Sequence, residues 1–305
     1  MSFTITDAFV QQFSGNVRLL AQQLTSRIRP CIIEDMITGE AAYVEQLAPT
    51  YARQVQSRHA DTPIMNTQSL RRRVAPYAWD WGDLVDRSDK VRLLIDPASN
   101  YARNAAAALG RGQDDAIIAA FFGTAYTGHT GSTAVTWPAG NSESSPTAPA
   151  GTQVGVNDWT YGNGSGNTGL TVSKMLSAMV ALDAAEGDEN EERFMVLGAR
   201  QKGQLLATTE ATSADYNTVR ALYDGKIDTF IGFKIIHSER LQTDGSGYYR
   251  IPAFRRSAMA IGIAQDIEGQ IFPRPDKRNA TQVYADMSVG ATRLEEAKLV
   301  EIKCT

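Results

Sequence analysis

The chain has 305 residues, 43% of them hydrophobic, and a formal net charge of -4 with a pI near 5.5. This length and composition allow a substantial buried core and exclude a largely disordered chain. The acidic balance argues against a surface that coats nucleic acid, and no apolar run approaches the ~18 residues of a membrane span. Because the N-terminus lacks a basic secretion-type segment, we expect a cytosolic protein whose Cys31 and Cys304 stay reduced.

An amphipathic helix is predicted over residues 6–27. Its apolar stripe consists of Phe9, Phe13, Val17, Leu20 and Leu24, with Gln, Asn and Arg on the opposite face. A stripe of this kind needs a cover, either the domain to which the helix belongs or a neighbouring subunit. Both alternatives remain open from the sequence.

Residues 29–94 read as short strands joined by polar stretches, with strand character at Pro30–Ile33 and Ala41–Leu47. A basic run, an aromatic set and an acidic run then follow: Arg71, Arg72, Arg73, then Tyr77, Trp79 and Trp81, then Asp80, Asp83, Asp86 and Asp89. Such a succession can bind nucleic acid. Since positive and negative charges nearly balance, an extended loop that pairs by charge with copies of itself is the favoured interpretation.

One long helix is predicted from Asp96 to Tyr126. Asp96 suits the N-cap and Pro97 the first helical position. Gly110 and Gly112 each cost about 1 kcal/mol relative to Ala, so a bend or junction is expected beside them. The alanines of 105–108 leave room for another backbone to lie close to the helix.

The stretch from His129 to Gly169 is rich in Gly, Ser, Thr, Asn and Pro and reads as a long exposed insertion. Its Gly164, Gly166 and Gly169 formally match GxGxxG, which would make Gly162–Gly169 a nucleotide-binding segment. The buried strand that a dinucleotide turn requires does not precede it. We therefore expect a loop outside any core, in which alanine replaces all three glycines with little effect on assembly.

A helix over 171–185, a buried strand over 193–198 and a helix over 199–208 are the next predicted elements, and their order suggests an α/β-type layer. The acidic turn at 186–192 lacks the calcium-loop spacing, so no metal site is predicted there. His59, His129 and His237 lie in no catalytic pattern. The sequence thus offers no catalytic, cofactor-binding or metal-binding residues.

Residues 226–241 contain a strand, a Gly-hydrophobic turn at Gly232–Phe233 and a second strand with a polar exit. This segment resembles the major capsid proteins of tailed bacteriophages with the Hong Kong 97-type fold. The stretch 256–262 resembles the late buried strand of that family, and 290–302 its closing strand. The resemblance implies an α+β Hong Kong 97-like capsid fold with an N-terminal arm, extended loop, long spine helix, and peripheral and apical domains.

The family pattern, laid on this chain, implies six parts. They are an N-terminal arm (1–38), the extended loop (39–94), the spine helix of the peripheral domain (95–128), a Gly/Ser/Thr-rich insertion (129–170), an apical domain (171–250) and returning strands (251–305). Members that weld subunits covalently use a Lys in the extended loop. No Lys occurs between Glu45 and Asp89, so cross-linking is not expected.

The resemblance implies a non-enzymatic coat protein that self-assembles, as hexamers and pentamers, into an icosahedral shell around double-stranded DNA. Expected partners are separate scaffolding and portal proteins and weakly bound packaged DNA, with no membrane and no cofactor. The implied location is the virion, after assembly in the host cytoplasm. Candidate subunit contacts are Phe9, Phe13, Val17, Leu20, Leu24, Arg71, Arg72, Arg73, Trp79, Trp81, Asp83 and Asp86. The alternatives are an encapsulin-like nanocompartment shell and a nucleotide-binding enzyme.

Overall fold

A computed structural model describes residues 22–58, 61–62, 64–85, 98–137, 152–162, 166–185, 190–207 and 229–305. The chain divides into two compact units. Unit 1 comprises Met1–Ser26, Tyr77–Gln113 and Gln265–Ser288, and unit 2 comprises Arg27–Pro76, Asp114–Ala264 and Val289–Thr305. Each unit is therefore assembled from segments far apart in the sequence.

Unit 2 contains a six-stranded mixed sheet with the order β7-β14-β11-β8-β10-β9. Its strands are β7 (Gln153–Val154), β8 (Arg193–Leu197), β9 (Thr229–Phe230), β10 (Phe233–His237), β11 (Tyr249–Arg255) and β14 (Leu299–Cys304). Strands β8 and β10 are parallel, whereas β11 runs antiparallel to both β8 and β14. The tight connection between β9 and β10 places Ile231 and Gly232 at positive φ, as a two-residue hairpin turn requires.

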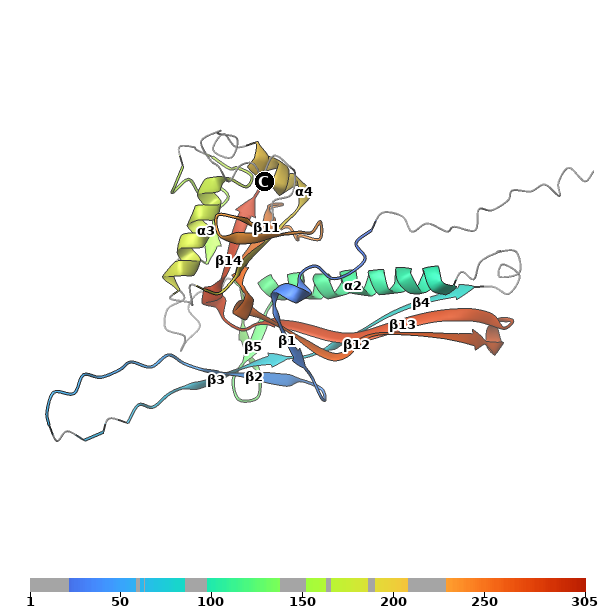
Figure 1. Ribbon diagram of the computed structural model, residues 1–305, viewed down its shortest axis with the longest axis horizontal. Helices are drawn as coiled ribbons and strands as arrows, with labels where there is room; N and C mark the ends of the chain where they lie inside the picture. Colours follow the sequence, from blue (N-terminus) through green and yellow to red (C-terminus); the bar gives the residue numbers. More distant parts are fainter. Residues whose placement is uncertain are drawn as a thin grey trace, which may run out of the picture. The chain divides into compact units, whose positions relative to one another are not determined.

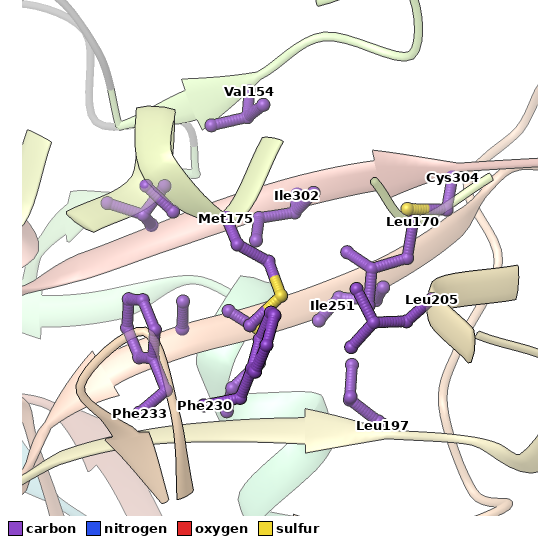
Figure 2. Close-up of a cluster of buried hydrophobic side chains, with 14 of the residues drawn as sticks. Val154, Leu170, Met175, Leu197, Leu205, Phe230, Phe233, Ile251, Ile302 and Cys304 are labelled. Carbon is purple, nitrogen blue, oxygen red and sulfur yellow. The ribbon is translucent and has the colours of Figure 1, made fainter. Parts of the chain in front are cut away.

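Two helices of unit 2, α3 (Val172–Ala184) and α4 (Ala199–Leu206), bury apolar side chains with one face of this sheet. Figure 2 shows Met175 and Leu205 pointing into a cluster with Ile251 and Ile302. Burying each such side chain stabilises the fold by about 1.5–3 kcal/mol. Thr171 begins α3 because its side chain accepts a hydrogen bond from the Lys174 backbone N–H.

The alternate residues of these strands lie on the opposite face of the six-stranded sheet. Phe254 of β11 lies with its ring 4.8 Å from Phe121 and 5.7 Å from Phe194, centroid to centroid. The predicted helices at 171–185 and 199–208 and the predicted buried strand at 193–198 are confirmed, to within a few residues at their ends. The strands predicted on either side of Gly232 are confirmed as well.

Two other sheets are four-stranded, with the orders β1-β12-β13-β4 and β2-β3-β5-β6. The first contains β1 (Ile33–Met36), β4 (Tyr77–Val85), β12 (Met259–Arg274) and β13 (Ala280–Arg293). The second contains β2 (Ala42–Leu47), β3 (Ser69–Val74), β5 (Ala125–Thr127) and β6 (Thr133–Val135). Within unit 2, β1 pairs in parallel with Ala260–Ile263 of β12.

The long helix α2 (Ala98–Phe122) is continuous through both glycines, so they do not interrupt it. The predicted junction is present in another form, because the boundary between the two units falls between Gln113 and Asp114. The glycines serve close packing instead. A Cβ at Gly110 would lie 3.1 Å from the Ser26 backbone nitrogen, and one at Gly112 would lie 3.2 Å from Met287 and 3.4 Å from Trp79. The helix also ends earlier than predicted, because Ala125–Thr127 form a strand.

Three short 3-10 helices replace parts of predicted strands. Arg29–Cys31 forms η2, so the first strand begins only at Ile33. Arg256–Ala258 forms η3, and the late buried strand starts at Met259. The segment predicted as one closing strand contains the last residues of β13 and most of β14, and η5 (Glu296–Lys298) separates the two strands. Apolar periodicity locates these segments but does not show where the chain turns.

Candidate assembly interface

Among the described residues of unit 2, several large exposed apolar side chains gather in the hairpin of β2 and β3. The two strands pair antiparallel from Ala42 opposite Val74 to Leu47 opposite Ser69, and the Ala48 N–H donates to the Gln68 carbonyl at 2.9 Å. Beyond this pair, the chain runs out as an extended loop (Figure 1) whose described residues form no helix or strand. We call the loop between Ala48 and Gln68 the distal loop.

Large apolar side chains of this region face solvent. The exposed fractions are 75% for Leu47, 81% for Tyr51, 77% for Val55, 95% for Ile64 and 46% for Met65. Single exposed apolar residues are normal on protein surfaces, whereas a concentration of them in one segment indicates an interaction site.

The base of the hairpin is firmly held within unit 2. Strand β3 pairs with β5 at Arg72 and Arg73, and the Tyr43 hydroxyl donates to the Thr130 carbonyl at 3.2 Å. The Leu294 carbonyl accepts from the side chains of Gln46 and Arg72, both at 3.1 Å, and so ties the two strands to one peptide group. A fixed base with an uncovered end is the geometry of an arm that presents its loop to another molecule.

The three arginines of β3 have different surroundings. Arg71 forms an exposed 2.9 Å ion pair with Glu45 and lies over the Tyr43 ring. The Arg72 side chain is 11% exposed and pairs with Glu296 at 2.6 Å. The Nε of Arg73 is buried without a hydrogen-bond partner among the described residues. Arg71 and Arg72 therefore bind within their own chain, and their role as subunit contacts stays a prediction.

A buried arginine supports the structure beneath the hairpin. Arg293 is fully buried and donates to the carbonyls of Ala120 (3.2 Å), Phe121 (3.0 Å) and Gly123 at the end of α2, and to Val135 (3.0 Å). It thus satisfies backbone acceptors that a helix C-terminus leaves without partners, and its positive charge suits that end of the helix dipole. Burial lowers the pKa of Arg293 to about 10, which leaves it charged at neutral pH.

A second buried charge lies on β14. Glu301 accepts from Trp137 at 2.6 Å, Gln153 at 2.7 Å and Arg250 at 2.5 Å. Burial alone would raise the pKa of Glu301, yet these bonds and the charge of Arg250 hold the pKa below its usual value. The Arg250 guanidinium lies 4.1 Å from the centroid of the Phe122 ring. Sequence reasoning missed Arg250, Arg293 and Glu301, whose only local signal is a charge inside an apolar strand.

The remaining predicted contact residues lie elsewhere. Trp79, Trp81 and Asp83 are on β4, in a different sheet from the arginines, so the basic and aromatic runs do not form one loop. Trp79 is 36% exposed and contacts the position of Gly112 within unit 1. Leu24 is 59% exposed. Phe9, Phe13, Val17, Leu20 and Asp86 lie outside the described residues.

The described end of the predicted N-terminal helix, Gln22–Arg27, is not helical. At the end of this segment, the Arg27 and Ile28 N–H groups donate to the buried Asp114 carboxylate at 3.2 Å. Those donors are therefore not available for helical hydrogen bonds.

The glycine-rich segment has no nucleotide-binding geometry in its described part. Residues 155–162 form turns and not a buried strand. Gly166 lies outside the core, but a Cβ at Gly169 would lie 2.2 Å from the Gln204 side chain, which accepts from the Leu170 N–H and donates to the Thr305 carbonyl. Alanine at Gly169 would therefore require the Gln204 side chain to move, and the prediction that alanine replaces all three glycines with little effect on assembly stays a prediction.

Within the described residues, no group of three or more His, Cys, Asp or Glu side chains is arranged to hold a metal ion. His237 lies 3.4 Å from Glu239, and His129 contributes its carbonyl to Arg71. No helix in the described part of the chain is long and apolar enough to cross a membrane.

Comparison with known proteins places this architecture. A model of the family described as phage capsid protein matches residues 5–305. Among solved structures, the capsid of cyanophage P-SCSP1u is 14% identical with a TM-score of 0.71, covering 100% of this chain and 95% of that one. The capsid of Ralstonia phage GP4 is 10% identical (TM-score 0.70; 100% and 97% covered), and the head of Helicobacter pylori bacteriophage KHP40 is 10% identical (TM-score 0.67; 95% and 93%). No curated protein matches the chain.

Proposed function

This chain belongs to the phage capsid protein family, and from that premise we propose that the β2–β3 hairpin is the arm by which each subunit grips the next. The protein is a structural major capsid protein of the Hong Kong 97-like fold, and its copies form an icosahedral head. Its function rests on surfaces that bind other copies and requires no catalytic group.

The observation that carries the proposal is the contrast between the two ends of the hairpin. At the base, side chains of both strands bind carbonyl groups of unit 2. At the other end, Tyr51, Val55 and Ile64 are each more than three-quarters exposed. Burying side chains of this size contributes about 1.5–3 kcal/mol each, and symmetry repeats the gain at every equivalent contact.

The exposed ion pair of Arg71 with Glu45 is part of this arm. We assign it to the rim of the contact, where charge sets specificity and association rate more than affinity. Scaffolding and portal proteins, packaged DNA and assembly in the host cytoplasm complete the proposed setting.

Shortening the arm tests the proposal. Residues 49–67 would be replaced by Asn-Gly, which closes a two-residue hairpin after the hydrogen-bonded pair Ala48 and Gln68. The shortened chain should give the circular dichroism spectrum of a folded protein and sediment as small species, whereas the full chain forms uniform shells in electron microscopy.

Gly203→Ala serves as the control, since no atom lies within 4 Å of the position that its new Cβ would occupy and the arm is untouched. That variant should form normal shells. Shells of normal size from the shortened chain would show that the arm is not required.

A further inference from the structure

A long sheet edge in unit 1 has no partner strand among the described residues. Strand β4 is the last strand in the order β1-β12-β13-β4, so β13 is its one neighbour among the described strands. Of its nine residues, only Trp81 is half-buried and only Val85 is buried. Edge strands of this length present unpaired N–H and C=O groups and readily accept another strand.

The distal loop offers a segment of matching length and opposite charge. Residues 51–56 form no helix or strand, and Figure 1 shows this side of the loop as an extended trace. Arg53 and Arg58 are exposed in this segment, while Asp80 and Asp83 are exposed on β4. No described strand pairs with residues 51–58 or with the free edge of β4, and the opposite charges favour a second copy as the occupant.

We propose that residues 51–58 of one subunit add to the free edge of β4 of another subunit as an antiparallel strand, with Arg53 opposite Asp83. This register places Tyr51 opposite Val85, Val55 opposite Trp81 and Ala52 opposite Leu84. Arg58 then lies diagonal to Asp80, within reach of a long side chain. The inference rests on the proposed function of the arm and names its receiving surface.

A parallel register with Arg53 opposite Asp80 would satisfy the same charges. It would, however, place Tyr51 opposite Ala78, Val55 opposite Gly82 and Leu84 opposite Ser57. Because cross-strand apolar pairs are the main unit of sheet stabilisation, the apolar matches select the antiparallel register.

Disulfide trapping tests the register. Gln54 and Gly82 would be directly opposite, where Cα atoms of antiparallel neighbours lie about 4.5–5.5 Å apart, within disulfide range. A Cβ at Gly82 meets its nearest atom at 3.5 Å, an ordinary contact, so cysteine is tolerated there. Shells of Gln54→Cys/Gly82→Cys should therefore give a ladder of covalent multimers after mild oxidation, whereas dilute subunits should not.

Two matched variants move only the donor cysteine. Gln56→Cys/Gly82→Cys shifts it by two residues, to about 7–8 Å, and should cross-link at least about tenfold less. Val55→Cys/Gly82→Cys reports the parallel register. A ladder from either variant equal to that of Gln54→Cys/Gly82→Cys would overturn the proposal, as would intact Gln54→Cys/Gly82→Cys shells without a ladder.

A charge exchange gives an independent answer if the cysteine variants do not assemble. Arg53→Asp and Asp83→Arg should each lower the shell yield by about fivefold or more, and the double variant should restore it. Absence of rescue would overturn the register. Failure of the unaltered chain to form shells would instead refute the proposed function, so the two failures are distinguishable.

Discussion

Replacing Arg293 by Met removes the guanidinium group that binds the end of α2 while keeping an unbranched apolar side chain of similar length. Four backbone carbonyls lose this donor, and Glu296, 3.9 Å away, loses one of its arginine neighbours. A buried polar group left without a partner costs about 1–3 kcal/mol, and breaking a buried charge cluster from one side about 3–5 kcal/mol. We expect a loss of about 3–5 kcal/mol, because some carbonyls can relax toward other donors.

Thermal unfolding of the unassembled subunit measures this loss. The expected decrease in Tm is roughly 6–20 °C, at about 2–4 °C per kcal/mol for a chain of this size class. Arg293→Lys keeps the charge but cannot reach all four acceptors, so its Tm should lie between that of the unaltered subunit and that of Arg293→Met. The control is Arg274→Met, which removes an exposed arginine paired with Asp276. If Arg293→Met unfolds like the unaltered subunit, the guanidinium does not hold the helix end.

Three further predictions use the unassembled subunit. Gly169→Ala should destabilise the subunit by about 1–3 kcal/mol in urea unfolding, because the new methyl group displaces Gln204 from two backbone partners. The control Gly203→Ala changes a helical site with open space and should instead stabilise the subunit by up to about 1 kcal/mol. Arg72→Glu should prevent stable folding, as it places a second carboxylate beside the largely buried Glu296, whereas Arg71→Glu at an exposed pair should change stability by no more than about 1 kcal/mol. The lowered pKa of Glu301 stabilises the fold above about pH 4.5, its unfolded value, and this contribution is lost as the pH falls through the folded pKa. Glu301→Gln should therefore show a flatter stability profile in acid, and an unchanged slope would contradict the assignment.

The sequence was sufficient for elements that local patterns define. Apolar spacing located α3, and the two apolar runs around Gly232 located β9 and β10, although the turn lies at Ile231–Gly232 and not at Gly232–Phe233. The positive φ of both turn residues and the alternation of the strands are properties of a few consecutive residues. A reader of one sequence has access to those properties.

Other features depend on distant residues and left no local signal. The sequence of β4 predicts part of a loop because its aromatic residues are interspersed with acidic ones, and only its pairing with β13 makes it a strand of a sheet. The continuity of α2 through Gly110 and Gly112 depends on Thr25, Ser26, Trp79 and Met287, which occupy the space that side chains would need. Arg293 and the carbonyl of Ala120 are 173 residues apart in the chain. No periodicity within either segment indicates that they meet.

The polar contacts that hold the base of the hairpin have a consequence for how this protein can change over time. Four of them end on main-chain oxygens, those of His129, Thr130 and Leu294, the last of which accepts two. A main-chain acceptor survives almost any replacement of its own side chain, so only the donors Tyr43, Gln46, Arg71 and Arg72 have their identity constrained by these bonds. Saturation mutagenesis scored by shell formation should accordingly tolerate more substitutions at 129 and 130 than at 46 and 72. With such an anchor, the side chains at the acceptor positions can change during evolution while the hydrogen bonds that hold the hairpin are kept.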